Sequence, residues 1–162
     1  MAYWHGANDG GYSALVSVTP TVEATPDYAS GDVLGGLMSV SAPRYPGGAG
    51  ILHYLSVSIK VDLAPIMNIV LFKSNPSATT FTENSALSLN AADYDKVLDV
   101  IPIVAADYFD LGTPRIARAR NLGIIFDPGA SDTVLYACAL AGEAINLASA
   151  SDLTFNFGIL QD

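Results

Sequence analysis

The sequence predicts an all-β protein, an antiparallel β-sandwich of jelly-roll type with about eight to ten strands. Short apolar segments are separated, at intervals of about eight to twelve residues, by turns rich in Gly, Pro, Asn and Asp. In several of these segments apolar residues occupy every second position, as in a strand with one buried face. Strands do not alternate with helices, so a parallel sheet is not expected. The 162 residues are enough to bury one core, which favours a single domain.

The first eleven residues are expected to form an extended arm outside this domain. The segment "MAYWHGANDGG" surrounds aromatic residues with Gly, Asn and Asp, and it has the period of neither a strand nor a helix. We therefore divide the chain into an N-terminal arm, residues 1–11, and a jelly-roll domain, residues 12–162. Tyr3, Trp4 and His5 are candidates for partner contact, because aromatic side chains anchor segments that become ordered on binding. An ordinary disordered terminus is the alternative.

Alternating apolar residues predict two strands early in the domain. In the first, the residues that share a face are Tyr12, Ala14, Val16 and Val18. In the clearest strand, "GILHYLSVSIKVDL", they are Ile51, His53, Leu55, Val57, Ile59 and Val61. His53 is therefore expected to be partly buried with a hydrogen-bond partner, and not a catalytic base. The nearly continuous apolar run "PIMNIVLF" is expected at the centre of a sheet.

The stretch "TPDYASGDVLGGLMSV", residues 25–40, raises the question of a phosphate-binding loop. Such a loop places its glycines between a strand and a helix, often beside a lysine, and here no lysine and no helical period follow. The stretch is therefore predicted to be a turn that leads into a strand. Gly31 and Asp32 are expected to reverse the chain, while Gly35 and Gly36 form a β-bulge or a place of close approach within the next strand.

One short helix is expected near residues 90–97, within "LSLNAADYDKV". Ser88 or Asn90 could cap it, and Asp93 favours its first turn. After it, four further strands are predicted, in "VLDVIPIV", "RIARARNLGIIF", "TVLYACALAG" and "DLTFNFGIL".

The chain shows no arrangement typical of an enzyme, a metal site or a cofactor site, and none of these is expected. Its two histidines lie far apart, and it has neither a Gly-x-Ser-x-Gly motif nor a zinc-ligand spacing. Its one cysteine, Cys138, lies in an apolar run and is expected to be buried and inert. The clustered acids, which are expected to form a solvated edge, are Asp93, Asp95, Asp99, Asp107 and Asp110. A sugar-cleaving enzyme that uses paired aspartates such as Asp93 and Asp95 is a minor alternative.

The charge balance excludes two kinds of partner. A net charge of −9 disfavours both nucleic acid and an anionic membrane surface. No signal peptide is evident, and the longest apolar run is too short to span a bilayer. Only 14% of the residues are charged, so the surface is unusually neutral and suited to cover by neighbouring subunits.

Three of the seven basic residues lie close together in "RIARARN". In an extended segment Arg118 and Arg120 face the same way, and Arg115 faces the opposite side. Two compatible interpretations stay open. The charges could protect an edge strand from uncontrolled pairing, or they could donate hydrogen bonds to carboxylates of a neighbouring subunit.

Three segments, "DYASGDVLGGL", "VLFKSNPSATTFTENSALSLNAADYDKV" and "FNFGILQD", resemble a group of small virion proteins of tailed bacteriophages. These are the head decoration or cement proteins and related minor structural proteins. The similarity covers about residues 19–162, and it lies in the order of structural motifs. The N-terminal arm departs from the shared pattern.

The resemblance implies a jelly roll that forms a homotrimer on the outer surface of an icosahedral head. There it would contact the major capsid protein and stabilise contacts between capsid subunits, after synthesis in the bacterial host cytoplasm. The alternative from another class is a receptor-binding or carbohydrate-binding jelly roll of a head or tail fibre.

Overall fold

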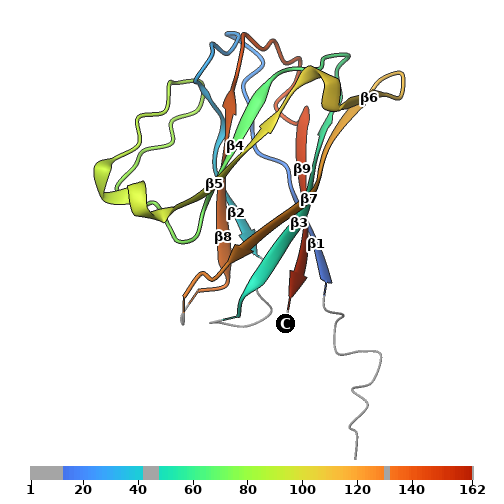
Figure 1. Ribbon diagram of the computed structural model, residues 1–162. Coiled ribbons are helices and arrows are strands. Elements are labelled where there is room, and N and C mark those ends of the chain that lie inside the picture. Colours follow the sequence, from blue (N-terminus) through green and yellow to red (C-terminus); the bar gives the residue numbers. More distant parts are fainter. Residues whose placement is uncertain (1–12, 42–47, 130–131, 162) are drawn as a thin grey trace, which may run out of the picture.

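The computed structural model describes residues 13–41, 48–129 and 132–161 (Figure 1). The strands are β1 (Ser13–Val18), β2 (Val33–Ser41), β3 (Gly50–Ile59), β4 (Met67–Phe72), β5 (Val97–Ile103), β6 (Tyr108–Asp110), β7 (Arg115–Phe126), β8 (Val134–Ala141) and β9 (Leu153–Gln161). Two short 3-10 helices, η1 (Ala91–Lys96) and η2 (Ala105–Asp107), flank β5. Within the described ranges no helix has the length and apolar character needed to cross a membrane.

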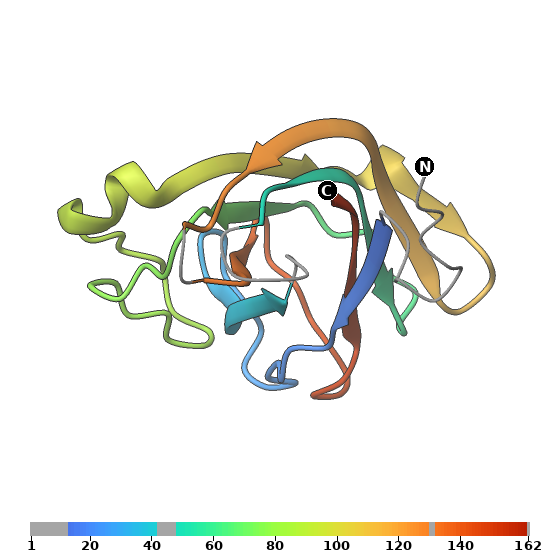
Figure 2. The same cartoon turned by 90° about the horizontal axis from the view of Figure 1, so that it is seen from below.

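The strands form two antiparallel sheets in a jelly-roll sandwich, as predicted. The strand orders are β1-β9-β3-β7-β6 and β2-β8-β4-β5. If β6 is set aside, the first strand pairs with the last, β2 with β8, β3 with β7, and β4 with β5. This is a long hairpin wound around itself, which is the jelly-roll topology. Figure 2 shows the beginning and end of the wound ribbon, β1 and β9, lying side by side.

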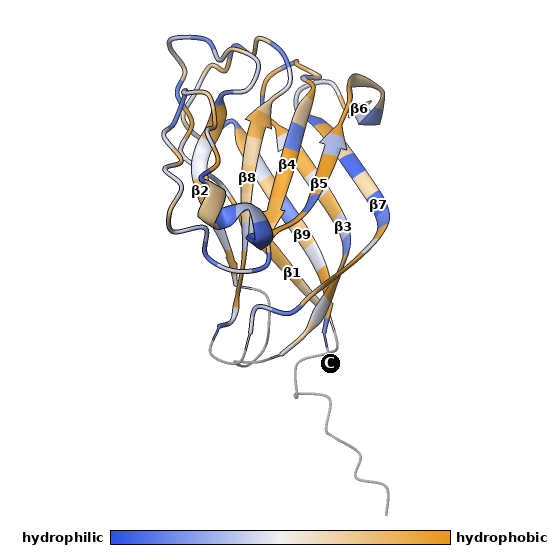
Figure 3. Cartoon of the chain, turned by 60° about the vertical axis from the view of Figure 1, so that its left-hand side comes forward, coloured by the Kyte–Doolittle hydropathy of each residue, from blue (hydrophilic) through white to orange (hydrophobic). Residues whose placement is uncertain are grey.

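The main core lies between the sheets. Leu55, Val57 and Phe157 of the five-stranded sheet are fully buried, as are Ile69 and Leu71 of the other. Strand β4 is almost entirely apolar (Figure 3), and it occupies an inner position in its sheet, as predicted. Removal of these side chains from water supplies the main driving force for folding.

Most of the outer face of the four-stranded sheet is covered by the chain itself. The long connection from β4 to β5 places Phe81, Leu87 and Leu89 against Phe72 and Cys138 of the sheet. The rings of Phe72 and Phe81 meet edge to face at 5.7 Å. Cys138 is buried, as predicted, and burial, helped by the charge of Glu83, raises the pKa of its thiol to about 12.

The stretch of residues 25–40 forms the predicted turn and bulged strand. Gly31 has φ +96° in the turn, and β2 begins at Val33. Gly35 and Gly36 have φ +76° and +77°, and the register of β2 against β8 is interrupted there. A Cβ on Gly35 would lie 2.2 Å from Pro20 Cβ, so close packing also demands glycine at this position.

The alternation predicted for β3 is wrong at the start of the strand. Leu55 is buried as expected, but Ile51 and His53 are exposed and Leu52 is buried. The registers of β3 against β7 and against β9 both shift between Leu52 and Tyr54, which marks a β-bulge at His53. An extra residue reverses the phase of a period-two pattern, so the residues before it change face. His53 is consequently a surface residue.

The short helix predicted near residues 90–97 is η1. Asn90 is its N-cap, and its side chain accepts a hydrogen bond from the Ala92 N–H at 3.0 Å. The helix is of the 3-10 type, and Val97 beyond it is already extended.

Candidate interaction surface on the five-stranded sheet

The outer face of the five-stranded sheet carries a row of exposed apolar side chains. Register places Ile51 of β3 directly opposite Leu160 of β9 and Ile125 of β7. These three side chains are 38%, 43% and 70% exposed. Leu15 of β1, on the same sheet, is 62% exposed. Because contiguous exposed apolar surface is uncommon on a monomer, this row marks a candidate contact surface.

A second row crosses the same face, and a tyrosine ring lies flat in it. Tyr54 pairs with Gly158 on one side and with Arg120 on the other. A Cβ on Gly158 would lie 2.1 Å from Cε1 of the Tyr54 ring. The glycine therefore leaves the space that the ring occupies above the neighbouring strand.

The third row is polar. Ser17 Oγ donates to Asn156 Oδ1 at 2.6 Å, and Asn156 Nδ2 donates to Ser56 Oγ at 3.3 Å. These bonds join β1, β9 and β3 across the face. Arg118 of β7 continues the row beyond Ser56. The face thus combines an apolar row with a band of hydrogen-bonding groups.

A hollow of about 360 Å³ opens between β3 and β7 on this face, and its lining residues are His53, Tyr54, Ser56, Arg118, Arg120 and Asn121. The β-bulge at His53 creates this hollow. Register passes from Leu52 opposite Ile124 to Tyr54 opposite Arg120. His53 alone therefore faces the three residues 121–123 of β7. Asn121 and Gly123 take positive φ, at 56° and 64°, to accommodate the extra residues. Such bulges redirect side chains and are frequent beside functional sites.

Arg118 and Arg120 are both exposed and line the hollow together, as their spacing predicted. Neither forms an ion pair with any residue that the structure describes. They also line an adjacent, more apolar hollow of about 220 Å³, formed with Phe109, Leu111 and Ile116. In Figure 3 the hydrophilic segments of β7 interrupt its apolar ones. The two guanidinium groups are therefore not engaged by any ion pair to the described residues, and they lie in a partly apolar setting.

Arg115 differs, because its guanidinium group is bound within the chain. Its Nε donates to Asp62 Oδ1 at 2.6 Å, and its Nη2 lies 3.4 Å from Asp110 Oδ2. The hydrogen bond to Asp62, with the charges of both carboxylates, raises the pKa of Arg115. Strand β6 pairs only with the start of β7, so beyond Ala117 this strand forms the sheet edge. Both interpretations of the arginines, edge protection and partner contact, are compatible with this placement.

Tyr3, Trp4 and His5 lie outside the described residues. Strand β1 begins at Ser13, opposite Leu160 of the apolar row.

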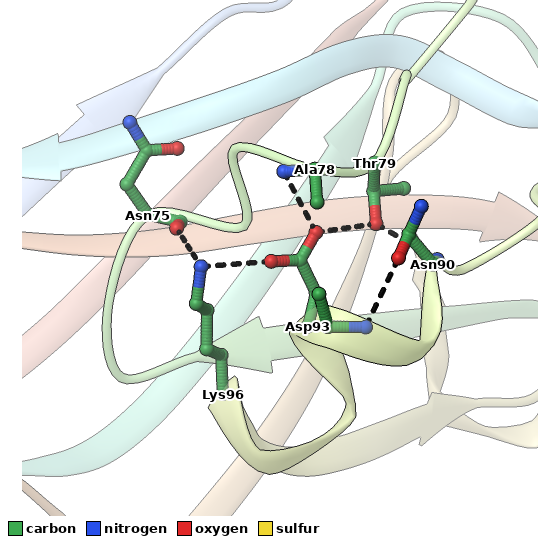
Figure 4. Close-up of polar contacts among 7 residues, drawn as sticks. Asn75, Ala78, Thr79, Asn90, Asp93 and Lys96 are labelled. Carbon is green, nitrogen blue, oxygen red and sulfur yellow. Dashed lines mark hydrogen bonds and ion pairs between the residues drawn. The ribbon is translucent and has the colours of Figure 1, made fainter.

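The expectation of a solvated acidic edge is wrong for Asp93, whose side chain is fully buried (Figure 4). It accepts hydrogen bonds from Thr79 Oγ1 at 2.6 Å and the Ala78 N–H at 3.1 Å, and it forms an ion pair with Lys96 at 2.8 Å. Burial alone would raise the pKa of Asp93, but Lys96 and these donors together lower it below its usual value. Asp93 joins η1 to Ala78 and Thr79, which lie earlier in the β4–β5 connection.

The arrangement at Asp93 also removes the geometric basis of a paired-aspartate enzyme. Asp95 is exposed, whereas the oxygens of Asp93 are occupied by internal partners. Across the described ranges no group of three or more His, Cys, Asp and Glu side chains is placed to hold a metal ion.

Sequence reasoning missed Glu83, which holds the β4–β5 connection against the bulge of β2. Its carboxylate accepts hydrogen bonds from the Gly35 N–H, the Tyr28 hydroxyl and the Glu23 N–H. Burial and the bond to Glu83 raise the pKa of Tyr28. No local pattern identifies Glu83, because its partners are distant in sequence. Tyr54 and Asn121 were missed for the same reason.

Comparisons with known proteins do not assign the chain to a family. No family model and no curated protein matches it. Among solved structures, a chain from Desmodium yellow mottle tymovirus aligns with a TM-score of 0.34 and 18% identity, over 93% of this chain and 80% of that one. A TM-score this low does not establish a shared fold. The jelly-roll assignment rests on the strand order alone.

Proposed function

We propose that this chain is a structural virion protein of a tailed bacteriophage. It acts as a cement protein that binds the outer surface of the icosahedral head as a homotrimer and stabilises contacts between major capsid protein subunits. The observation that carries the proposal is the contrast between the two sheets. The four-stranded sheet has most of its outer face covered by residues of its own chain. The outer face of the five-stranded sheet exposes Leu15, Ile51, Ile125 and Leu160, beside two arginines that form no ion pair with the described residues.

A face of this kind suits lasting contact with another protein surface, because it combines apolar area with a few free donors. Modest individual contacts are sufficient for a cement protein, since repeated placement on one particle raises the effective affinity. The resemblance of three sequence segments to head decoration proteins supports the same function.

The proposal is tested by adding the purified protein back to phage heads from which this chain has been removed. We expect rebinding and restored resistance to mild denaturant. The double variant Ile125→Ser/Leu160→Ser should rebind at least about tenfold more weakly, because it loses most of the apolar row. Ile66→Ser, at an exposed isoleucine away from this face, is the matched control. Heads that lack the chain yet resist denaturant equally well would contradict the cement function.

The hollow beside Tyr54 favours a second candidate function, a receptor-binding or carbohydrate-binding module of a head or tail fibre. The ring of Tyr54 can stack on a sugar, and the polar side chains of His53, Ser56 and Asn121 can form hydrogen bonds with the sugar hydroxyls. A glycan array distinguishes the two functions. Selective binding of one glycan class, lost in Tyr54→Ala, supports the fibre module, and absence of glycan binding together with rebinding to heads supports the cement protein.

A further inference from the structure

Exposed apolar side chains gather on two separate parts of the described molecule. One group belongs to the five-stranded sheet and the β6–β7 turn, and its members are Leu15, Ile51, Phe109, Leu111, Ile125 and Leu160. The second group lies along η1 and β5 and the residue after β5. Its members are Tyr94, Val100 and Val104, which are 62%, 46% and 41% exposed. Strand β5 is the edge strand of its sheet, so this second group lies on an open side of the sandwich.

Each group is accompanied by charge of one sign. Arg118 and Arg120 lie next to Phe109 and Leu111, and we call these four residues the arginine surface. On the other side the exposed carboxylates of Asp95 and Asp99 lie within the segment that exposes Tyr94 and Val100, and we call these four residues the acidic surface. Asp99 and Val100 point to opposite sides of the edge strand β5, so this surface runs along the open edge of the sheet and not over one face.

Neither surface is neutralised by residues of its own chain within the described ranges. The arginines have no ion pair among the described residues. Lys96, the cation beside the acidic surface, has its Nζ bound to Asp93 at 2.8 Å and to the Asn75 carbonyl at 2.9 Å. The two surfaces therefore match each other in both charge and apolar character.

We propose that the arginine surface of one copy binds the acidic surface of a second copy, so that the chain associates head to tail. Guanidinium groups bind carboxylates with two parallel hydrogen bonds, and the flanking apolar side chains exclude water from them. Two different surfaces on one molecule give a heterologous contact, which forms a closed ring when the rotation between copies closes. This inference rests on the proposed function, because it specifies how the homotrimer forms.

Two charge-reversal variants of the full chain test the contact. Arg118→Glu/Arg120→Glu reverses the charge of the arginine surface, and Asp95→Lys/Asp99→Lys reverses the charge of the acidic surface. In sedimentation experiments each variant alone should associate at least about tenfold more weakly than the wild type. Mixed together they should associate again, because each copy keeps one intact surface that the other can bind and the two reversed surfaces carry opposite charges.

The control for the arginine variant is Lys60→Glu/Lys73→Glu, which makes the same charge change at two other exposed cations and should associate like the wild type. Unfolding curves of all variants establish that each is folded. A wild type that stays monomeric at every concentration overturns the inference, as does a mixture of the two variants that forms no dimer.

Failure of this contact is distinguishable from failure of the proposed function. If the wild type is monomeric but the arginine variant loses binding to phage heads, the arginine surface binds another protein. The head-to-tail contact is then wrong while the cement function stands.

Discussion

At the scale of single residues, the buried ion pair of Asp93 makes a prediction about pH. Its pKa is lowered on folding, so its stabilising contribution is complete above the ordinary carboxyl pKa of about 4 and is lost as the pH falls through the lower pKa of the folded state. Asp93→Asn should lower the urea midpoint at pH 7, and the gap from the wild type should narrow below about pH 4. Asp95→Asn, which removes an exposed carboxylate, is the control and should leave the midpoint unchanged. If the difference in urea midpoint between Asp93→Asn and the wild type stayed constant from pH 7 to below about pH 4, the ion-pair role of Asp93 would be contradicted.

Gly35 makes the second residue-scale prediction. Gly35→Ala adds a methyl group against Pro20 at a positive φ, and it should lower the free energy of unfolding by about 3 kcal/mol or more. Gly31→Ala has a similar φ with open space around the new methyl group, so it should cost only about 1–2 kcal/mol. Urea denaturation measures both values. Equal losses would mean that the contact with Pro20 has no energetic weight.

These residues also show where prediction from sequence succeeds and fails. The bulge at Gly35 and Gly36 was predictable, because two glycines interrupt an otherwise apolar strand. The bulge at His53 was not, because its causes, Asn121 and Gly123, lie on a strand that meets β3 only in the folded chain. Asp93 was correctly placed at the start of a helix, but nothing local indicated that Ala78 and Thr79 would enclose it.

At the scale of elements, the β4–β5 connection acts as a second layer over the four-stranded sheet. Phe81→Ala should remove its main contact with Phe72 and cost about 2 kcal/mol, less than for a fully buried ring because Phe81 is half-buried. Urea denaturation and the binding of an apolar dye measure the effect. Ser77→Ala, an exposed change in the same connection, should alter neither. An unchanged stability of Phe81→Ala would mean that the connection contributes little to the fold.

At the scale of the whole molecule, net charge and the exposed apolar row oppose each other. The charge of −9 at pH 7 keeps copies apart except at specific contacts, and it approaches zero near the isoelectric point of about 4.3. We expect light scattering to rise as the pH approaches that point, and to rise less for Ile125→Ser/Leu160→Ser. Ile66→Ser should aggregate like the wild type. If Ile66→Ser lowered the light scattering more than Ile125→Ser/Leu160→Ser does, the surface responsible for aggregation would lie elsewhere.

The whole fold was more predictable than the candidate surface. Strand spacing and turn residues indicate an antiparallel sandwich. In a jelly roll the first strand pairs with the last, so this pairing follows from the predicted fold. The surface, by contrast, is assembled from Leu15, Ile51, Ile125 and Leu160 on four different strands, and only the pairing of these strands brings the residues to one face of the sheet.

The pairing of β1 with β9 has a practical consequence for anyone who labels or fuses this protein. Ser13 lies opposite Leu160, so a tag or a displayed peptide attached at either end of the domain would emerge beside the apolar row. Such an attachment would obstruct the candidate surface and give a false negative in a binding assay. A dye placed at the exposed Ser77 would instead report from the opposite sheet.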